Sequence, residues 1–207
     1  MQQAFLSGED FHTLTAAKVF HVSPEEVTPR MRSGAKAVNF GIVYGISAFS
    51  LAQDIGVSVA EAKEYMERFF DTYRGVKAYM EQVVETAHEQ GYVETLMHRR
   101  RELPELKSSN FNMRSFGERV ALNMPIQGTA ADIMKLAMVR VERRLAREGL
   151  AAQLIMQVHD ELIVECPEEE KEKVEHLLTE EMSGVVQLSV PLPAEAHSGK
   201  TWLEAKE

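Results

Sequence analysis

Four side chains that stand four residues apart in the segment MRSGAKAVNFGIVYG constrain the fold of this chain more than any other feature. Steps of four keep side chains on one face of an α-helix, so the spacing predicts a helix over about residues 30–44. Pro29 suits the first turn of such a helix. Gly45 can adopt the left-handed conformation that ends one. The helix would carry two cations and then two aromatic rings along one stripe: Arg32, Lys36, Phe40 and Tyr44.

This stripe would be about 18 Å long at roughly 1.5 Å per residue. A nucleoside triphosphate needs Arg or Lys at its phosphates and a flat apolar surface at its base, so the stripe suits a nucleotide site. An amphipathic helix with Phe40 and Tyr44 in the core and solvated cations explains the same spacing. Gly34 and Gly41 each cost a helix about 1 kcal/mol relative to Ala, which indicates a close approach of another group or helix to the backbone.

The bulk composition is that of a soluble globular chain. With 207 residues it can form one large domain or two small ones. It has no apolar run long enough to span a bilayer and no signal-peptide pattern at its start. Cys166 is the only cysteine, which excludes an internal disulfide and a cysteine-rich metal site. We therefore expect a cytoplasmic location and no membrane partner.

The net charge of −9 is unevenly distributed along the chain. From Asp160 to the end there are 13 acidic and 4 basic side chains, whereas the preceding part has 19 of each. Positive charge gathers locally around Arg32, at residues 99–101 and around Arg119. Phosphate binding depends on local potential, so the net charge does not exclude a nucleic-acid partner. A solvated charged surface is the alternative explanation of the arginine triplet.

Capping signals and hydrophobic periodicity predict a helix-rich first part and an α+β second part. Pro125 is expected to interrupt the long helical pattern near its middle. The predicted helices cover residues 11–20, 30–44, 47–55, 58–70, 75–91, 111–124, 129–147 and 167–183. The predicted strands cover residues 92–96, 154–158, 162–165, 185–190 and 194–197. A sheet of three or four strands backed by helices would suit residues 150–207.

Three polar residues, His159, Asp160 and Glu161, stand where two apolar β-type runs reverse. Polar turn residues are the commonest explanation of such a cluster. A carboxylate is also the ligand that Mg²⁺ prefers, although two-metal phosphoryl chemistry needs carboxylates from separate segments. Both interpretations stay open on spacing alone. A metal-dependent phosphohydrolase would need further paired His and Asp ligands, and the other histidines are scattered without such a pattern.

Taken together, these segments resemble the family A DNA polymerases of the bacterial DNA polymerase I type. RSGAKAVNFGIVYG is similar to the nucleotide-binding motif B of that family, and QVHDELIVE is similar to its catalytic motif C. ERVALNMPIQGTAAD, between them, resembles the helix that lies along the primer–template duplex. The resemblance implies an α+β fold. Residues 1–109 would be mostly fingers, and residues 110–207 the C-terminal part of a palm, with a small antiparallel sheet backed by helices and a catalytic hairpin at about 153–165.

The resemblance also assigns roles to individual positions. The triphosphate contacts would be His12, Arg32 and Lys36, and Lys36 would also protonate the leaving pyrophosphate. Phe40 and Tyr44 would flank the incoming sugar and base. Asp160 would be a metal ligand supported by Glu161. The DNA contacts would be Arg101 at the backbone and, along the minor groove, Arg119, Asn123, Gln127 and His159.

The implied activity is template-directed DNA synthesis from deoxynucleoside triphosphates with two Mg²⁺ ions. Primer–template DNA, the nucleotides and the upstream remainder of the polymerase would be its partners. The family's motif A, a DYSQIE-like strand with the other metal-binding Asp, has no counterpart here, and neither does the thumb. We therefore expect the isolated chain to be inactive in primer extension. A nucleotide- or DNA-binding module without catalysis is the alternative.

Overall fold

The computed structural model describes residues 1–206, with the backbone alone at Val43, and Glu207 of the expected palm segment lies outside the described residues. The chain forms two compact units, Met1–Gly128 and Thr129–Glu207. Helices dominate, accompanied by two small antiparallel sheets, so the predicted α+β fold class is confirmed. Among the described residues, no helix combines the length and apolarity that crossing a membrane requires.

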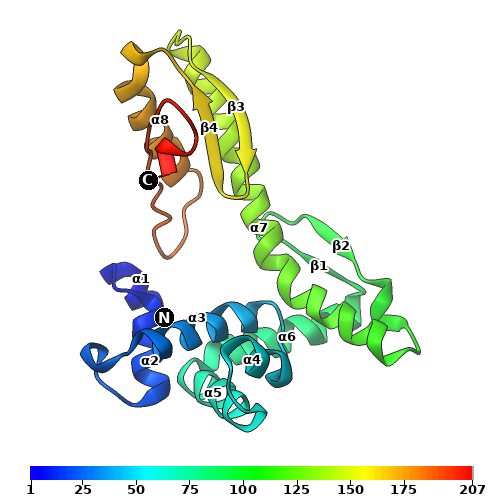
Figure 1. The fold of residues 1–207 in the computed structure, drawn as a ribbon. Helices are drawn as coiled ribbons and strands as arrows, with labels where there is room; N and C mark the ends of the chain where they lie inside the picture. The colour runs from blue at the N-terminus through cyan, green and yellow to red at the C-terminus, as the bar shows by residue number, and fades with distance from the viewer. Residues whose placement is uncertain (207) are drawn as a thin grey trace. The chain divides into compact units, whose positions relative to one another are not determined.

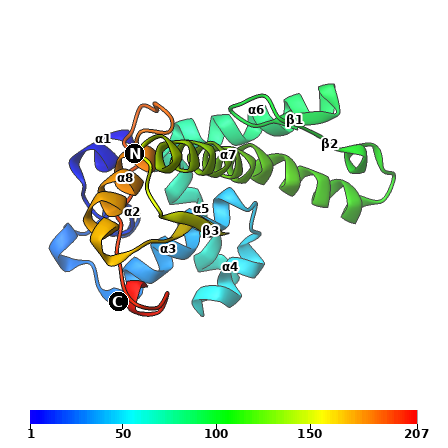
Figure 2. The same cartoon turned by 90° about the horizontal axis from the view of Figure 1, so that it is seen from above.

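Six helices and one short 3₁₀ turn form most of the first unit (Figures 1 and 2). Serine caps begin two of them where the sequence predicts a helix start: Ser47 Oγ accepts from the Ser50 amide at 3.1 Å, and Ser58 Oγ accepts from the Glu61 amide at 3.2 Å. The elements are α1 (Gln2–Ser7), α2 (Phe11–Phe20), η1 (Pro24–Glu26), α3 (Pro29–Val43), α4 (Ala48–Ile55), α5 (Val59–Thr72) and α6 (Arg74–Gln90).

The apolar faces of α2 to α5 meet in one core cluster. Its buried members are Val19, Val38, Ile42, Leu51, Ala52, Ala62, Phe69 and Tyr73. The aromatic residues of α5 also take part in this cluster, with Phe69 buried within it and Tyr65 and Phe70 partly buried against it. Burial of these side chains supplies the main driving force that fixes the rotation of each helix about its axis.

The arginine triplet lies at and beside a short hairpin in the first unit. β1 (Tyr92–Glu94) pairs antiparallel with β2 (Arg100–Glu102), with Val93 opposite Arg101. The strand expected over 92–96 is thus shorter, and β2 was not predicted. Residues 99–102 are three arginines and a glutamate, so they lack the alternation of apolar and polar side chains that predicts a strand. Buried Val93, Leu103 and Leu106 anchor the hairpin and the following η2 (Pro104–Lys107).

One continuous helix, α7 (Phe111–Arg147), replaces the two helices expected on either side of Pro125. The prediction of an interruption is wrong. A proline removes one backbone donor and crowds the preceding turn, and an anchored helix can bear that cost. Here Ala121 is buried before the proline, and Ala137 and Val141 are buried after it, so each half is held by its own packing.

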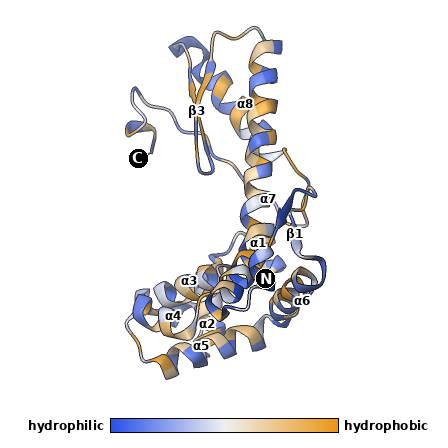
Figure 3. Ribbon diagram, turned by 90° about the vertical axis from the view of Figure 1, so that its right-hand side faces the viewer, coloured by the Kyte–Doolittle hydropathy of each residue, from blue (hydrophilic) through white to orange (hydrophobic). Residues whose placement is uncertain are grey.

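In the second unit, β3 (Gln153–Val158) and β4 (Glu161–Glu165) form the predicted hairpin. Helix α8 (Lys171–Ser183) follows η3 (Glu168–Glu170), and η4 (Glu204–Lys206) comes last. The core joins the end of α7 to α8 and the hairpin through Val141, Leu145, Ala152, Val174 and Leu177. Figure 3 colours part of β3 as hydrophobic, although Ile155 and Met156 are exposed.

The strands expected over residues 185–190 and 194–197 do not form, and the sheet has two strands rather than three or four. A strand needs a neighbouring edge to bond with. In the described chain these residues form bends and irregular backbone, and half of them are exposed. The alternation of apolar residues in these segments therefore indicated a tendency to form strands, but the described chain offers no neighbouring strand for them to pair with.

Helix α3 ends in a Schellman motif that explains Gly41 but not Gly34. The amide of Ile46 donates to the Gly41 carbonyl at 2.8 Å, and the Gly45 amide donates to the Ile42 carbonyl at 2.9 Å. Gly45 has a φ of 65°, which favours glycine. A Cβ added at Gly41 would lie 2.6 Å from Ile46 Cγ2, whereas one added at Gly34 would meet nothing within 4 Å.

These contacts predict opposite effects for two equivalent substitutions. Gly34→Ala should raise the free energy of unfolding by up to about 1 kcal/mol, because it adds helix propensity without a clash. Gly41→Ala should lower it by about 1–3 kcal/mol, because the β-branched Ile46 must be displaced. Denaturant unfolding of both variants beside the parent chain measures the difference. Equal stability of the two variants would contradict the packing described for Ile46.

Candidate functional site

The stripe predicted on α3 is exposed along its whole length. Phe40 and Tyr44 are 51% and 48% exposed, and both cations are also exposed. The opposite face is buried at Ala35, Val38 and Ile42. The interpretation that places the two rings in the core is therefore wrong. Burial of the opposite face leaves both cations and both rings presented to solvent.

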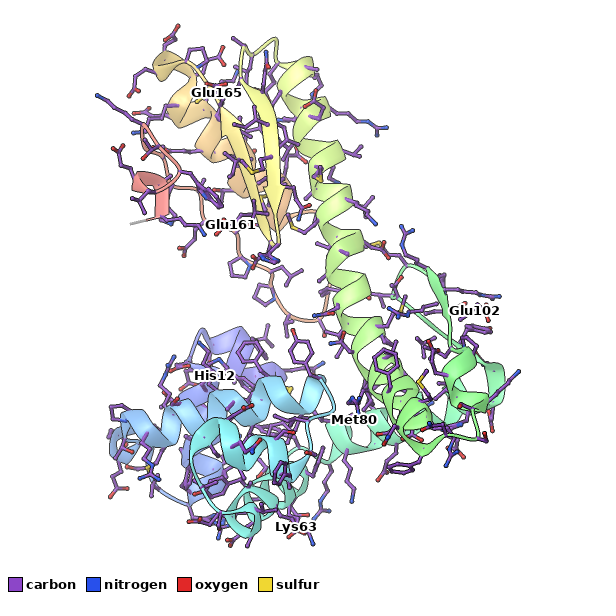
Figure 4. The ribbon with its side chains drawn as sticks, turned by 45° about the vertical axis from the view of Figure 1, so that its right-hand side comes forward. His12, Lys63, Met80, Glu102, Glu161 and Glu165 are labelled. Atoms are coloured by element: carbon purple, nitrogen blue, oxygen red, sulfur yellow. The ribbon has the colours of Figure 1, made fainter. Side chains whose placement is uncertain are left out.

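His12 of α2, labelled in Figure 4, lies beside this stripe. Its ring centroid is 5.7 Å from that of Phe40, and Lys36 Nζ lies 6.0 Å from the same Phe40 ring. Asn39 Nδ2 donates to His12 Nδ1 at 3.0 Å, which puts the proton of the neutral imidazole on Nε2. Burial lowers the pKa of His12, and nearby Arg32 and Lys36 lower it further against the opposing effect of Asp10.

Asp10 holds the first cation of the stripe. Its carboxylate accepts from Arg32 Nε at 2.5 Å, from Thr13 Oγ1 at 2.7 Å and from the His12 amide at 3.1 Å. It thereby caps α2 and pairs with α3 at the same time. The hydrogen bond from Arg32, followed by that from Thr13, holds the pKa of Asp10 well below its usual range. The carboxylate thus sets where Arg32 stands.

Tyr44, at the end of α3, is tied to α7. Gln127 Nε2 donates to Tyr44 Oη at 3.1 Å. A Cβ at Gly45 would lie 3.2 Å from Arg119 Cγ and 3.3 Å from Leu122 Cδ1, so glycine permits the close approach of α7. The end of the aromatic stripe therefore meets the helix that carries the predicted DNA contacts.

Four of the five predicted DNA-contact residues surround one hollow of about 580 Å³. Its polar lining includes Tyr44, Arg101, Arg119, Asn123 and Gln127. Among the described residues Asn123 Nδ2 has no hydrogen-bond partner, although it is buried, which is a costly arrangement for a donor. A second hollow of about 750 Å³ lies beside the end of α3 and shares Tyr44 and Arg119 with the first.

The neighbouring arginines of the β1–β2 hairpin differ in their surroundings. Arg100 Nε pairs with Glu94 Oε1 at 2.6 Å, and its guanidinium lies 4.5 Å from the Tyr92 ring centroid. Arg101 is exposed, and among the described residues it has no ion pair. Of these two arginines, Arg101 is the one whose charge is available to an anion.

The fifth predicted DNA contact and the acidic pair lie in the second unit, at the turn of the β3–β4 hairpin. Val158 pairs with Glu161, so His159 and Asp160 form a two-residue turn, and His159 has a φ of 51°. Both turn residues are exposed. Figure 4 places Glu161 at the turn end of β4 and Glu165 at its other end. Glu161 Oε1 pairs with Lys206 Nζ at 3.0 Å, while its Oε2 is buried and has no hydrogen-bond partner within residues 1–206.

This hairpin provides oxygen ligands for a hard cation but not a complete metal centre. Asp160 and Glu161 are the acidic residues at the turn. Among the described residues, no group of three or more His, Cys, Asp or Glu side chains is placed to hold a metal ion. Any magnesium site built on Asp160 needs further ligands.

Sequence reasoning missed Asp10, Asn39 and Lys206 as partners of the site. Asp10 carries an N-cap signal ahead of residues 11–20, but its pairing with Arg32 joins two helices and leaves no local pattern. Lys206 meets a residue 45 positions earlier in the chain. Such long-range pairs depend on how helices and tails pack.

The Asp10–Arg32 pair predicts a pH-dependent contribution to stability. Because the folded-state pKa of Asp10 is lowered, this contribution is present above about pH 4 and is lost as the pH falls towards the lowered value. Asp10→Asn keeps a capping side chain but removes the charge, and should cost about 0.5–1 kcal/mol at pH 7.

Thermal unfolding between pH 7 and pH 3 measures this cost. The difference between the parent chain and Asp10→Asn should shrink below pH 4. Asp54→Asn removes an exposed carboxylate from α4 and is the matched control for the loss of one surface charge. A difference for Asp10→Asn that stays constant across this range would contradict the pairing.

Known proteins resemble this chain over almost its whole length. The model of DNA polymerase family A matches residues 1–204. DNA polymerase I of Bacillus caldotenax is 54% identical over 206 residues, covering 100% of this chain and 24% of the relative. DNA polymerase I of Bacillus subtilis is 53% identical over 204 residues, covering 99% of this chain and 23% of the relative. The chain thus spans about a quarter of the length of these curated relatives.

A solved structure agrees over the whole chain. The POL domain of Pol1 from M. smegmatis, in complex with DNA primer-template and dNTP, has a TM-score of 0.94 and 44% sequence identity. The match covers 100% of this chain and 36% of that one.

Proposed function

Because the chain belongs to DNA polymerase family A, we propose that it forms the fingers and the C-terminal part of the palm of a DNA-directed DNA polymerase. Residues 1–109 would be mostly fingers and residues 110–207 mostly palm. The observation that carries the proposal is the exposed α3 stripe, which ends at Tyr44 beside the hollow lined by Arg101, Arg119, Asn123 and Gln127. One face offers groups for a triphosphate, and the adjoining hollow offers donors for DNA.

The α3 stripe would bind an incoming deoxynucleoside triphosphate. Arg32 and Lys36 supply charge-assisted hydrogen bonds to phosphate oxygens, and the Nε2 proton of His12 adds a third donor. Phe40 and Tyr44 supply apolar surface for the sugar and base. To engage the triphosphate, Arg32 exchanges at least part of its bonding with Asp10. Lys36, as a cationic acid, would give a proton to the departing pyrophosphate.

The hollow would bind the primer–template duplex near the growing end. Arg119, Asn123, Gln127 and His159 would donate to minor-groove acceptors, which are shared by every correctly formed base pair, so they would report geometry rather than sequence. The partnerless Asn123 Nδ2 supports this role, because DNA would satisfy it. Gln127 would exchange its bond with Tyr44 for one with DNA. Arg101 would meet the phosphate backbone.

Asp160 would hold Mg²⁺, with Glu161 in support. The donor set fits, because both side chains provide the carboxylate oxygens that this cation prefers, and Glu161 Oε2 is buried with no hydrogen-bond partner in the described part of the chain. The remaining ligands would come from outside the described residues, as the family's motif A implies. Two bound ions would stabilise negative charge on the attacking and leaving oxygens.

The reaction would be attack of the primer 3′-hydroxyl oxygen on the α-phosphorus of the nucleotide. A new oxygen–phosphorus bond forms, the hydroxyl proton passes to water, the bond between the α-phosphorus and the oxygen that bridges to the β-phosphorus breaks, and pyrophosphate leaves. This chain would align the triphosphate through α3 and the primer end through α7. By itself it would bind nucleotide or DNA without catalysing extension, because the described residues hold one of the two principal aspartates.

Substitution of Asp160 tests this function against a purely structural turn. In a full-length polymerase carrying this chain, Asp160→Asn should slow single-turnover nucleotide incorporation at least about 100-fold, since it removes charge from the reaction centre. Stability should stay level or rise, because repulsion with Glu161 is relieved. DNA binding through Arg119, Asn123 and Gln127 should survive.

The measurement combines rapid-quench incorporation, a melting curve and a DNA-binding titration. Asp54→Asn, on α4, provides the matched control for loss of one exposed acid. Near-normal incorporation by Asp160→Asn would contradict the metal-ligand role and the proposed catalytic hairpin.

A further inference from the structure

The two adjacent carboxylates of the β3–β4 turn have unequal surroundings. Asp160 is exposed and has no ion pair among residues 1–206. Glu161 is half-buried, its Oε1 lies 3.0 Å from Lys206 Nζ, and its Oε2 is buried without a partner. One carboxylate of the pair is therefore neutralised by the chain itself, while the other presents its full charge to solvent.

A compact turn near the end of the chain delivers Lys206 to this position. The Lys200 amide donates to Glu204 Oε2 at 2.8 Å, and the Glu204 amide donates to Thr201 Oγ1 at 3.3 Å. The amides of Ala205 and Lys206 donate to carbonyls three or four residues earlier, at 3.1 Å each. The turn is tight, because a Cβ at Gly199 would lie 2.6 Å from Glu204 Cβ. Lys206 thus projects from an ordered turn.

Trp202 restricts the lysine further. Lys206 Nζ lies 5.0 Å from the Trp202 ring centroid, within the range of a cation–π contact. A lysine side chain is long and flexible, and pairing it with a carboxylate costs conformational entropy. The ring and the turn reduce that cost, because they hold the ammonium near Glu161 before any ligand arrives.

We propose that Lys206 is a positioning residue that occupies Glu161 and leaves Asp160 as the carboxylate first offered to a divalent cation. The inference rests on the proposed function of the hairpin. Lys206 and the cation compete for Glu161, since both bind its carboxylate through charge. Removal of Lys206 releases Glu161 as an extra ligand, which tightens cation binding and misplaces the cation.

Direct cation binding tests this competition without relying on activity. Mn²⁺ is a paramagnetic probe whose unbound fraction is measured by electron paramagnetic resonance. In a full-length polymerase carrying this chain, Lys206→Ala should bind Mn²⁺ about five-fold more tightly, the scale of one unit charge at close range in water. Lys206→Arg should resemble the parent. Lys200→Ala, which removes an equal charge from the same turn, is the matched control and should also resemble the parent.

The same Lys206 substitution in a Glu161→Gln protein tells whether the change in Mn²⁺ affinity comes from release of the Glu161 carboxylate or from the loss of one positive charge. If Glu161 is the group released, Lys206→Ala should change Mn²⁺ affinity by less than about two-fold in a Glu161→Gln protein. That protein has no carboxylate at position 161 to release, so the effects of the two substitutions are not additive. An equal effect of Lys206→Ala in both backgrounds would overturn the proposal. In kinetics, Lys206→Ala should lower kcat while KM for the nucleotide stays within about two-fold, as expected for a group that acts on the reacting centre.

Asp160→Asn distinguishes failure of this inference from failure of the proposed function. Loss of Mn²⁺ binding and of incorporation in Asp160→Asn, together with parent-like behaviour of Lys206→Ala, overturns the role of Lys206 alone. Retention of both properties in Asp160→Asn overturns the catalytic hairpin and the role of Lys206 with it. Tightened binding in Lys206→Ala that disappears in the Glu161→Gln background supports the inference.

Discussion

Burial of one face of α3 determines the rest of the candidate site. Val38 and Ile42 are each 2% exposed and lie in the core shared by α2, α4 and α5. Residues two apart on a helix point about 200° apart around its axis. Burying Val38 therefore turns Lys36 and Phe40 outward. The outward position of the α3 stripe follows from hydrophobic packing on the opposite side of the same helix.

Two side chains of the α3 stripe, Arg32 and Tyr44, already have partners within the described chain. Asp10 holds Arg32, and Gln127 holds Tyr44. These contacts are exposed or half-buried, so each is weak enough to be exchanged. We propose that substrate binding replaces these internal contacts. The chain would thereby keep its side chains oriented in advance and lower the entropic cost of binding.

Local signals in the sequence predicted most helices and the β3–β4 hairpin, because caps and apolar periodicity act within a few residues. They failed where long-range packing decides. Pro125 lies inside a continuous helix because each half is anchored separately, and residues 185–190 lack a strand partner. Spacing alone left Phe40 undecided between core and site, and its 51% exposure excludes the core placement, while its role in binding stays a prediction.

The roles of Arg101, Arg119, Asn123 and Gln127 came from family resemblance and stay predictions. No periodicity joins the β1–β2 hairpin to α7, and the common hollow emerges only from the fold. The Asp10–Arg32 contact likewise joins residues 22 positions apart on different helices. In each case the residue types are visible in the sequence, but their closeness in space depends on tertiary packing and could not be predicted from it.

Protection of Lys36 by nucleotide tests the central claim most directly. A full-length polymerase carrying this chain would be bound to a chain-terminated primer–template and treated with an amine-acylating reagent, with modification followed by mass spectrometry. The complementary deoxynucleoside triphosphate should slow modification of Lys36 several-fold, and a non-complementary one should have little effect. Lys63, whose side chain is 71% exposed on α5, should react equally in all cases. Equal modification of Lys36 with and without the complementary nucleotide would contradict the assignment of the α3 stripe as the triphosphate site.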